Sequence, residues 1–436
     1  MAWIAGLTVL IVGIGWLIRS NLWTLRVIRA TPQQIHEIVG DDLAWRPPDP
    51  TGPVITCTAI AQELGSDRLQ APRFERMTDA QILLKAPEMA AVRRETDRFE
   101  ALIAGKTLDS SHRSEKIESL SYVSRAYISQ FEFDLIDHKP QEAVDRLAKI
   151  AAMIRFLSSE LSGYEGRFAW YQCTLMLDIA AEYVAKRPGL PPEVLRSMYS
   201  VIDPAPRIDP GLVPDLKTSL AREIEEWRNP TEETLSKRIS PDPYLGVAYA
   251  AGEFDVPKTL RQAVAVYREA IRNSELAWNR QDWSAALNTL RQAKQLPPAP
   301  NIPETAAAPV KLWSKIWYEQ QIKQIPNALG VASLSELGAP NNQVSLSFHH
   351  RVRIEQARLL IALLLYRATY GVYPPSLASL GRLKLPGPLP IDLYASGAWR
   401  YDAKRQMFWS VGANGKDDGG TFIRGGWADD VVYKLP

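Results

Sequence analysis

The chain of 436 residues contains little cysteine and little histidine, and this scarcity excludes several kinds of site. Its two cysteines, Cys57 and Cys173, lie far apart and form no CxxC pair, so the sequence offers no zinc-binding spacing. They form either one disulfide or two buried thiols. The five histidines form no HExxH motif. The adjacent pair His349 and His350 begins a predicted helix, where neighbouring residues point to different faces and do not share a ligand.

An excess of charge of one sign is also missing. The formal net charge is +2 and no long run of like charge is present, which argues against a protein that binds nucleic acid through a broad basic face. The sequence contains no GxSxG, P-loop, GxGxxG or metalloprotease motif. We therefore expect no nucleic-acid partner, and the sequence identifies no catalytic residue.

One long apolar run is present, at the amino terminus. Residues 2–18, AWIAGLTVLIVGIGWLI, carry no charge, and as a helix they would be roughly 26 Å long, the short end of a membrane span. Trp3, Trp16 and Trp23 lie near its ends, where interface aromatics are common. No Lys or Arg precedes the run and no small-residue cleavage site follows it. We predict a retained single-pass anchor within residues 1–30 and not a cleaved signal peptide.

Helical periodicity dominates residues 31–344, which we predict to form an irregular helical domain. The segment EAVDRLAKIAAMIRFLSSEL places its apolar residues on one stripe at steps of three and four. That stripe consists of Val144, Leu147, Ile150, Ala151, Ile154 and Leu157. Further helices are predicted within 173–189, 190–203, 262–278 and 282–296. The helical pairs loosely resemble TPR hairpins, but no sustained repeat period is present, so a repeat array stays an alternative.

Residues 345–436 change character and predict a small α+β domain. SFHHRVRIEQARLLIALLLYRATYG predicts one long helix, and its segment 359–366, flanked by Arg358 and Arg367, is apolar on every side and needs burial on every side. AWRYDA and QMFWSV predict a hairpin, and DVVYKL predicts a third strand. The predicted fold class is mainly α. It comprises an N-terminal transmembrane helix, an irregular helical middle domain, and an α+β domain in which a long helix packs on an antiparallel sheet.

An acidic loop rich in glycine joins the second and third of these strands. It starts with SVGANGKDDGG and ends at an acidic pair, Asp429 and Asp430. Calcium takes oxygen ligands from carboxylates and backbone carbonyls, and glycines let those carbonyls turn inward. Without a cation, the clustered carboxylates would repel one another and some of their pKa values would rise. The sequence therefore predicts that the acidic pairs at the two ends of the loop close around one cation, with a solvated turn as the alternative.

This carboxyl-terminal region resembles the globular part of the major pseudopilin of type II secretion systems. ALLLYRATYGVYPPSLASL is similar to the family's helix and its Tyr-x-x-x-x-Gly-x-Tyr-Pro segment, and LPIDLYASGAWRY stands where the family has a Leu-Pro-x-Asp-Pro turn before a strand. FWSVGANGKDDGG, followed by ADDVV, is similar to the family's Tyr-Ser-x-Gly-x-Asp-Gly loop and closing acidic pair. In that family the loop binds calcium. The resemblance implies four calcium ligands, Asp417, Asp418, Asp429 and Asp430, together with backbone oxygens of 411–415.

The chain also departs from the family pattern. Asn414 replaces an Asp of the loop, and Leu393 replaces the Pro of the turn. The amino terminus lacks the prepilin-peptidase signature, and a long helical region separates it from the pseudopilin-like part. We infer a borrowed fold and not a working pseudopilin.

Together these features predict a membrane-anchored envelope protein with a structural or partner-binding role, linked to secretion or pilus-type machinery. Arg19, Arg26 and Arg29 follow the apolar run and favour a cytoplasmic location of the bulk. A calcium-stabilised domain favours the opposite side, so we predict an inner-membrane protein whose bulk is periplasmic. Two alternatives stay open: an envelope hydrolase whose site is assembled in the helical domain, and a helical adaptor that faces the cytoplasm.

Overall fold

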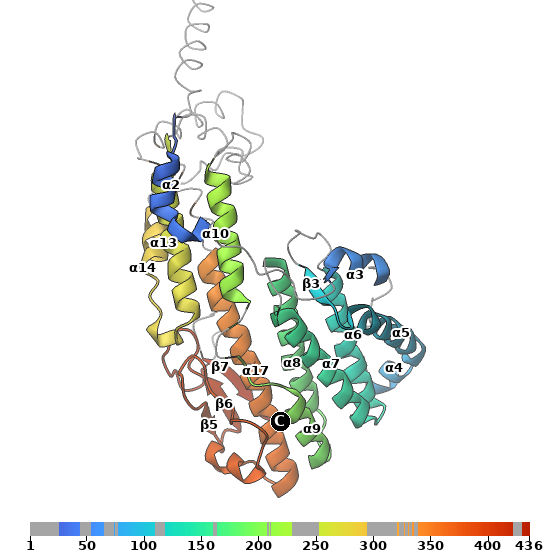
Figure 1. Ribbon diagram of the computed structural model, residues 1–436. Helices are drawn as coiled ribbons and strands as arrows, with labels where there is room; N and C mark the ends of the chain where they lie inside the picture. Colours follow the sequence, from blue (N-terminus) through green and yellow to red (C-terminus); the bar gives the residue numbers. More distant parts are fainter. Residues whose placement is uncertain are drawn as a thin grey trace, which may run out of the picture. The chain divides into compact units, whose positions relative to one another are not determined.

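The structure is a computed structural model, and it describes the chain in separate stretches. These are residues 26–43, 54–64, 74, 77–109, 118–159, 164–206, 209, 211–228, 253–293, 321, 327, 330, 334, 339–421 and 430–436. The described chain is mainly helical with a small antiparallel sheet at its carboxyl end, as predicted (Figure 1). None of the helices in these stretches is long and apolar enough to cross a membrane. The predicted anchor at residues 2–18 lies outside them.

Contacts divide the chain into two compact units. The first contains residues 1–46, 216–272 and 282–342, and the second contains 47–215, 273–281 and 343–436. The chain passes into the second unit at residue 343, close to the boundary predicted at 345. Residues 343–436 nevertheless share their unit with residues 47–215, because helices of the predicted middle domain pack on them.

The first unit contains a short parallel ladder and several amphipathic helices. Strand β1 (Arg26–Ile28) pairs in parallel with β4 (Glu253–Asp255). The helical elements are α2 (Pro32–Val39), η1 (Gly40–Leu43), most of α10 (Leu212–Arg228), most of α13 (Val256–Ser274) and α14 (Ser284–Ala293).

Helix starts in this unit are capped by side chains. Thr31 and Gln34 form a capping box at α2, in which each side chain accepts a hydrogen bond from the other residue's backbone N–H. Glu269, which is 3% exposed, accepts hydrogen bonds from the backbone N–H groups of Ala285 and Ala286 at 2.6 and 3.1 Å. Its carboxylate thereby satisfies two free donors at the start of α14, where negative charge is also favoured by the helix dipole.

The second unit begins with an array of packed helices. They are α3 (Cys57–Leu64), α4 (Asp79–Leu83), α5 (Ala86–Ile103), α6 (Glu118–Ile136), α7 (Pro140–Ser159), α8 (Tyr164–Ala185) and α9 (Pro192–Val201). Helix α6 packs against α7 and α8, and α7 packs against α9 (Figure 1). Strands β2 (Val54–Thr56) and β3 (Thr107–Asp109) form a parallel pair.

The apolar periodicity of this array predicts its buried face correctly. Of the stripe expected on α7, Val144, Leu147, Ile150 and Ala151 are buried and Ile154 is partly buried. Proline 192 occupies the first turn of α9, where its missing N–H breaks no hydrogen bond. Cys173 is a buried free thiol, and burial raises its pKa to about 12. The side chain of Cys57 lies outside the described residues.

The carboxyl-terminal region adds the long helix and the sheet. Its elements are α17 (Ala339–Tyr370), η5 (Leu377–Leu383), β5 (Arg400–Asp402), β6 (Met407–Ser410) and β7 (Val431–Lys434), with a further 3-10 turn, η3 (Trp278–Arg280), from the same unit. The strands are antiparallel in the order β5-β6-β7, and all four residues of the central strand are buried. The hairpin and the third strand were predicted and are confirmed.

Helix α17 lies in the core of the second unit. Every residue from Leu359 to Tyr366 is buried, which confirms the prediction for a helix that is apolar on all sides. Arg358, at the border of this segment, is also buried and pairs with Glu355 at 3.2 Å. Its guanidinium donates to the Tyr199 hydroxyl at 2.9 Å, so the charge has partners that compensate its lost hydration.

Candidate metal centre

The candidate metal centre is the loop between β6 and β7, and it is anchored by an aspartate that precedes it in the chain. Asp392 is 0% exposed and sits where the chain turns back through a bridge to Gly397. Its Oδ1 accepts hydrogen bonds from the Ser410 hydroxyl at 2.7 Å and from the backbone N–H of Tyr394 at 3.0 Å, and its Oδ2 accepts one from the backbone N–H of Val411 at 3.1 Å. Both oxygens are therefore used to hold the end of β6.

Asp417 is neutralised by groups of the protein. Its Oδ2 accepts a hydrogen bond from Arg400 Nε at 2.9 Å, and its Oδ1 accepts bonds from Trp409 Nε1 at 2.9 Å and from the backbone N–H of Gly419 at 3.1 Å. The bond from Trp409, followed by those from Gly419 and Arg400, lowers the pKa of this carboxyl. Asp417 is therefore ionised at neutral pH and its oxygens already have donors.

Asp430 is in the opposite situation. It is 1% exposed, and its Oδ2 accepts a hydrogen bond from the backbone N–H of Gly420 at 2.8 Å. Its Oδ1 has no hydrogen-bond partner among the described residues. Burial raises the pKa of this carboxyl, the backbone N–H groups of Gly420 and Asp418 oppose that rise, and the nearby charges of Asp417 and Asp418 add to it. A buried carboxylate oxygen without a donor is costly, and a bound cation would remove that cost.

The remaining predicted ligands are only partly placed. Asp418 is exposed, and its Oδ2 accepts a hydrogen bond from the Asn414 amide at 3.1 Å. Asp429 lies outside the described residues. The carbonyls of Gly412 and Ala413 accept hydrogen bonds from the N–H of Gly415 and from Trp278 Nε1, at 3.2 and 2.8 Å. No group of three or more His, Cys, Asp or Glu residues converges on one point within the part of the chain that the structure describes.

Glycine is required at the position that holds Asp430. The backbone of Gly420 has φ +72°, in the left-handed region, and a Cβ built there would lie 2.5 Å from Met407 Cε and 3.2 Å from the Trp409 ring. By contrast, Gly415 has φ +69° and a Cβ there would meet nothing within 4 Å. The loop therefore packs closely against β6 at one end and is open at the other.

The histidine pair is built into the core of the second unit. His350 Nδ1 lies 2.7 Å from the Thr174 hydroxyl, and the His350 ring stacks on Tyr171 with centroids 4.3 Å apart. His349 Nε2 accepts a hydrogen bond from Arg353 Nε at 2.9 Å. Burial, and then the charge of Arg353, lowers the pKa of His349 to about 4, so its ring is neutral at pH 7.

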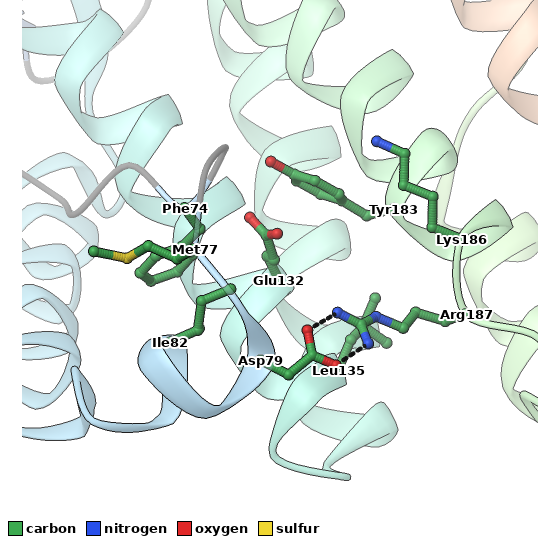
Figure 2. A pocket seen from close by; sticks show the side chains of 9 residues that line it. All are labelled: Phe74, Met77, Asp79, Ile82, Glu132, Leu135, Tyr183, Lys186 and Arg187. Carbon is green, nitrogen blue, oxygen red and sulfur yellow. Dashed lines mark hydrogen bonds and ion pairs between the residues drawn. The ribbon is translucent and has the colours of Figure 1, made fainter.

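The second unit also contains a cavity that was not expected from the sequence. It has a volume of about 240 Å³ and lies at the carboxyl ends of α6 and α8, beside α4 (Figure 2). Its walls are formed by apolar and charged side chains of three separate segments: Phe74, Met77, Asp79, Ile82, Glu132, Leu135, Tyr183, Lys186 and Arg187. The sequence segment QFEFDLI places Glu132 between two aromatic residues, but this local pattern alone does not predict a cavity.

The chain has no recognisable relatives in the comparisons. No family model matches the sequence, and no curated protein and no solved structure is significantly similar to it. The resemblance of the carboxyl-terminal region to the pseudopilin family therefore stays a prediction that rests on the quoted motifs.

Proposed function

We propose that this protein is a membrane-anchored protein of the cell envelope with a structural or partner-binding role, and that calcium stabilises its carboxyl-terminal α+β region. The observation that carries the proposal is the Oδ1 atom of Asp430, a buried carboxylate oxygen that has no hydrogen-bond partner within the part of the chain that the structure describes. Calcium prefers such hard oxygen ligands. In this proposal Asp430 and Asp418 would hold the ion, because Asp417 already accepts hydrogen bonds from Arg400 and Trp409.

The role of calcium in this proposal is structural. The loop 411–430 connects the central strand β6 to the edge strand β7, and Asp430 directly precedes β7. An ion held there would neutralise the carboxylates and fix the start of β7 against β6. The irregular helical region and the predicted anchor complete the proposed architecture: the anchor holds the chain at the membrane, and the helices offer a surface to a partner.

Calcium titration of the full chain tests the ion. Because an ion that binds only the folded state stabilises it, calcium at about 100 times its dissociation constant raises the free energy of unfolding by about 2.7 kcal/mol. We expect this rise in wild type and in Asp417→Asn, and its loss in Asp430→Asn, measured by urea unfolding in calcium and in EDTA. Asp203→Asn, which removes an exposed carboxylate of the same unit, is the control and keeps the rise. Equal stability of wild type in both buffers would rule the calcium site out.

A reporter fused after Pro436 tests the location. We expect alkaline phosphatase fused there to be active, because it folds only outside the cytoplasm. We expect green fluorescent protein fused at the same position, and exported without the Tat pathway, to be dark. The opposite pattern would support the cytoplasm-facing adaptor, in which free calcium is scarce. Recovery of the fusion in the soluble fraction would contradict the predicted anchor at residues 2–18.

A further inference from the structure

The cavity between α4, α6 and α8 has an apolar floor. Phe74, Ile82 and Leu135 are 4%, 2% and 7% exposed, so these side chains are packed and form a fixed wall. Met77 is 37% exposed and lies at the rim. A volume of about 240 Å³ is small for a cofactor and suits one long side chain or a small organic molecule.

One pair of charges in the cavity is already neutralised. Arg187 donates hydrogen bonds to both carboxylate oxygens of Asp79, at 2.6 and 2.8 Å (Figure 2). A bidentate pair of this geometry satisfies both groups. The Arg187 bonds lower the pKa of Asp79, so this carboxylate stays charged and paired. Asp79 and Arg187 therefore compensate each other, and neither is available to bind a charged group of a ligand.

Glu132 is the charge that remains inside. Figure 2 shows its side chain in the middle of the cavity, with the carboxylate between Phe74 and Tyr183. The Tyr183 hydroxyl hydrogen-bonds to it, but no Lys or Arg of the described chain forms an ion pair with it within 4.0 Å. Lys186 also lines the cavity, with its Nζ 5.5 Å from the centroid of the Tyr183 ring. Burial raises the pKa of Glu132, against the opposing effects of Tyr183, Arg187 and Lys186.

We infer that this cavity binds a lysine or arginine side chain of a partner polypeptide, with its aliphatic stem on Phe74, Ile82 and Leu135 and its cationic head on the Glu132 carboxylate. Such a side chain has an apolar stem that matches the apolar floor of the cavity and a charged head that matches the Glu132 carboxylate. An anionic ligand would meet Glu132 and be repelled. The inference rests on the partner-binding role proposed above.

The surface beside the cavity supports a polypeptide as the source of that side chain. Leu84 is 79% exposed and Leu83 is 40% exposed, both at the carboxyl end of α4, the short helix that begins two residues after Met77. A separate hollow of about 310 Å³ is lined by Leu83 and Met89 among others. Large apolar residues gathered at one exposed place are typical of sites that bind other proteins. A peptide with leucines on either side of a basic residue would cover them.

Two pentapeptides test the inference on the full chain. Both are acetylated and amidated; one reads Ala-Leu-Lys-Leu-Ala, and the other carries uncharged norleucine in place of lysine. Methionine methyl NMR reports on Met77 at the rim, and Met198, which is 0% exposed, serves as an internal reference. We expect the lysine peptide to shift the Met77 signal and to bind about tenfold more tightly than the norleucine peptide, the difference that about 1.4 kcal/mol produces.

Glu132→Gln isolates the charge. It keeps the size of the side chain and should reduce affinity for the lysine peptide to that of the norleucine peptide. Glu193→Gln, on the exposed surface of α9, is the matched control and should bind as wild type does. Equal affinity of wild type and Glu132→Gln for the lysine peptide would overturn the inference, as would an unmoved Met77 signal.

The pH dependence of wild type gives a second readout that needs no variant. The charged groups that face Glu132 are Asp79 on α4 and Lys186 and Arg187 after α8, with the Tyr183 hydroxyl beside them. Because the pKa of Glu132 is raised above its ordinary value of 4.5, affinity for the lysine peptide should fall as the pH is lowered towards that pKa, while affinity for the norleucine peptide stays constant. Parallel curves for the two peptides would contradict the role of Glu132. Neither experiment requires calcium or a membrane, so its failure is distinct from failure of the proposed envelope role.

Discussion

Two buried aspartates near the ends of the carboxyl-terminal sheet have the same burial and different surroundings. Asp392 is 0% exposed and Asp430 is 1% exposed. Three donors of the protein satisfy both oxygens of Asp392. Among the described residues Asp430 meets only backbone donors: the N–H of Gly420 bonds its Oδ2, the N–H of Asp418 also favours its charged form, and its Oδ1 has no hydrogen-bond partner. Burial alone therefore does not distinguish a carboxylate that the protein fully satisfies from one that needs a cation. The number of hydrogen-bond donors around the carboxylate distinguishes them.

The difference in hydrogen-bond donors also indicates which carboxylate of the acidic loop needs an ion. Asp417 and Asp418 are more exposed than Asp430 and have side-chain donors of their own, from Arg400, Trp409 and Asn414. The loop therefore contains more acidic residues than carboxylates that need a cation. The residue that needs one is the least exposed of the three, because water reaches it least and no side chain of the described residues donates a hydrogen bond to it.

The largest effect is expected at Asp392. In Asp392→Asn the amide nitrogen replaces one acceptor, so it faces a backbone N–H or the Ser410 hydroxyl, and one or more buried donors lose their partner. We expect the free energy of unfolding to fall by about 3 kcal/mol, in calcium and in EDTA alike. Urea unfolding of the full chain measures it.

Asp430→Asn tests whether Asp430 differs from Asp392 in its contribution to stability. In EDTA this change removes an uncompensated buried charge and keeps an acceptor for Gly420, so the free energy of unfolding should stay within about 1 kcal/mol of wild type. A loss in EDTA as large as that of Asp392→Asn would show that Asp430 is a carboxylate that the protein fully satisfies too, and the argument for an ion would fail.

The sequence predicted the parts of this region that local patterns control. The run from Leu359 to Tyr366 is apolar on all sides and is buried, and the segments AWRYDA and QMFWSV form the predicted β5-β6 hairpin. The fate of the acids was not predictable in the same way. Arg400 and Trp409 are register partners across that hairpin, and together they reach Asp417, which only the folding of the loop brings to them.

The cavity was beyond sequence reasoning for a related reason. Its charged residues come from three segments, at Asp79, Glu132 and Arg187, and each of them alone is ordinary for the exposed face of a helix or a helix end. Asp79 pairs with Arg187 because the packing of α4 on α6 brings the start of α4 to the end of α8, and Glu132 is left without an ion pair among the described residues. No periodicity or spacing in the sequence carries that information.

An effect smaller than that of Asp392→Asn is expected at the glycines of the loop. Gly420→Ala and Gly415→Ala both place a Cβ on left-handed backbone, which costs each about 1 kcal/mol. Only Gly420→Ala also forces the new Cβ against Met407 and the Trp409 ring, and we expect a further loss of about 1–2 kcal/mol from this overpacking. Urea unfolding of the two variants in EDTA gives the difference directly.

The same pair of variants links the loop backbone to the proposed ion. Because the N–H of Gly420 is the donor that positions Asp430, a displaced backbone at 420 should also weaken calcium binding, while Gly415→Ala should leave it as in wild type. Calcium titrations of the two variants, monitored by the change in the urea midpoint, test this. If both variants gained the same stability from calcium as wild type, the ion would be held without Asp430, and the unpaired oxygen would have to be explained by another partner.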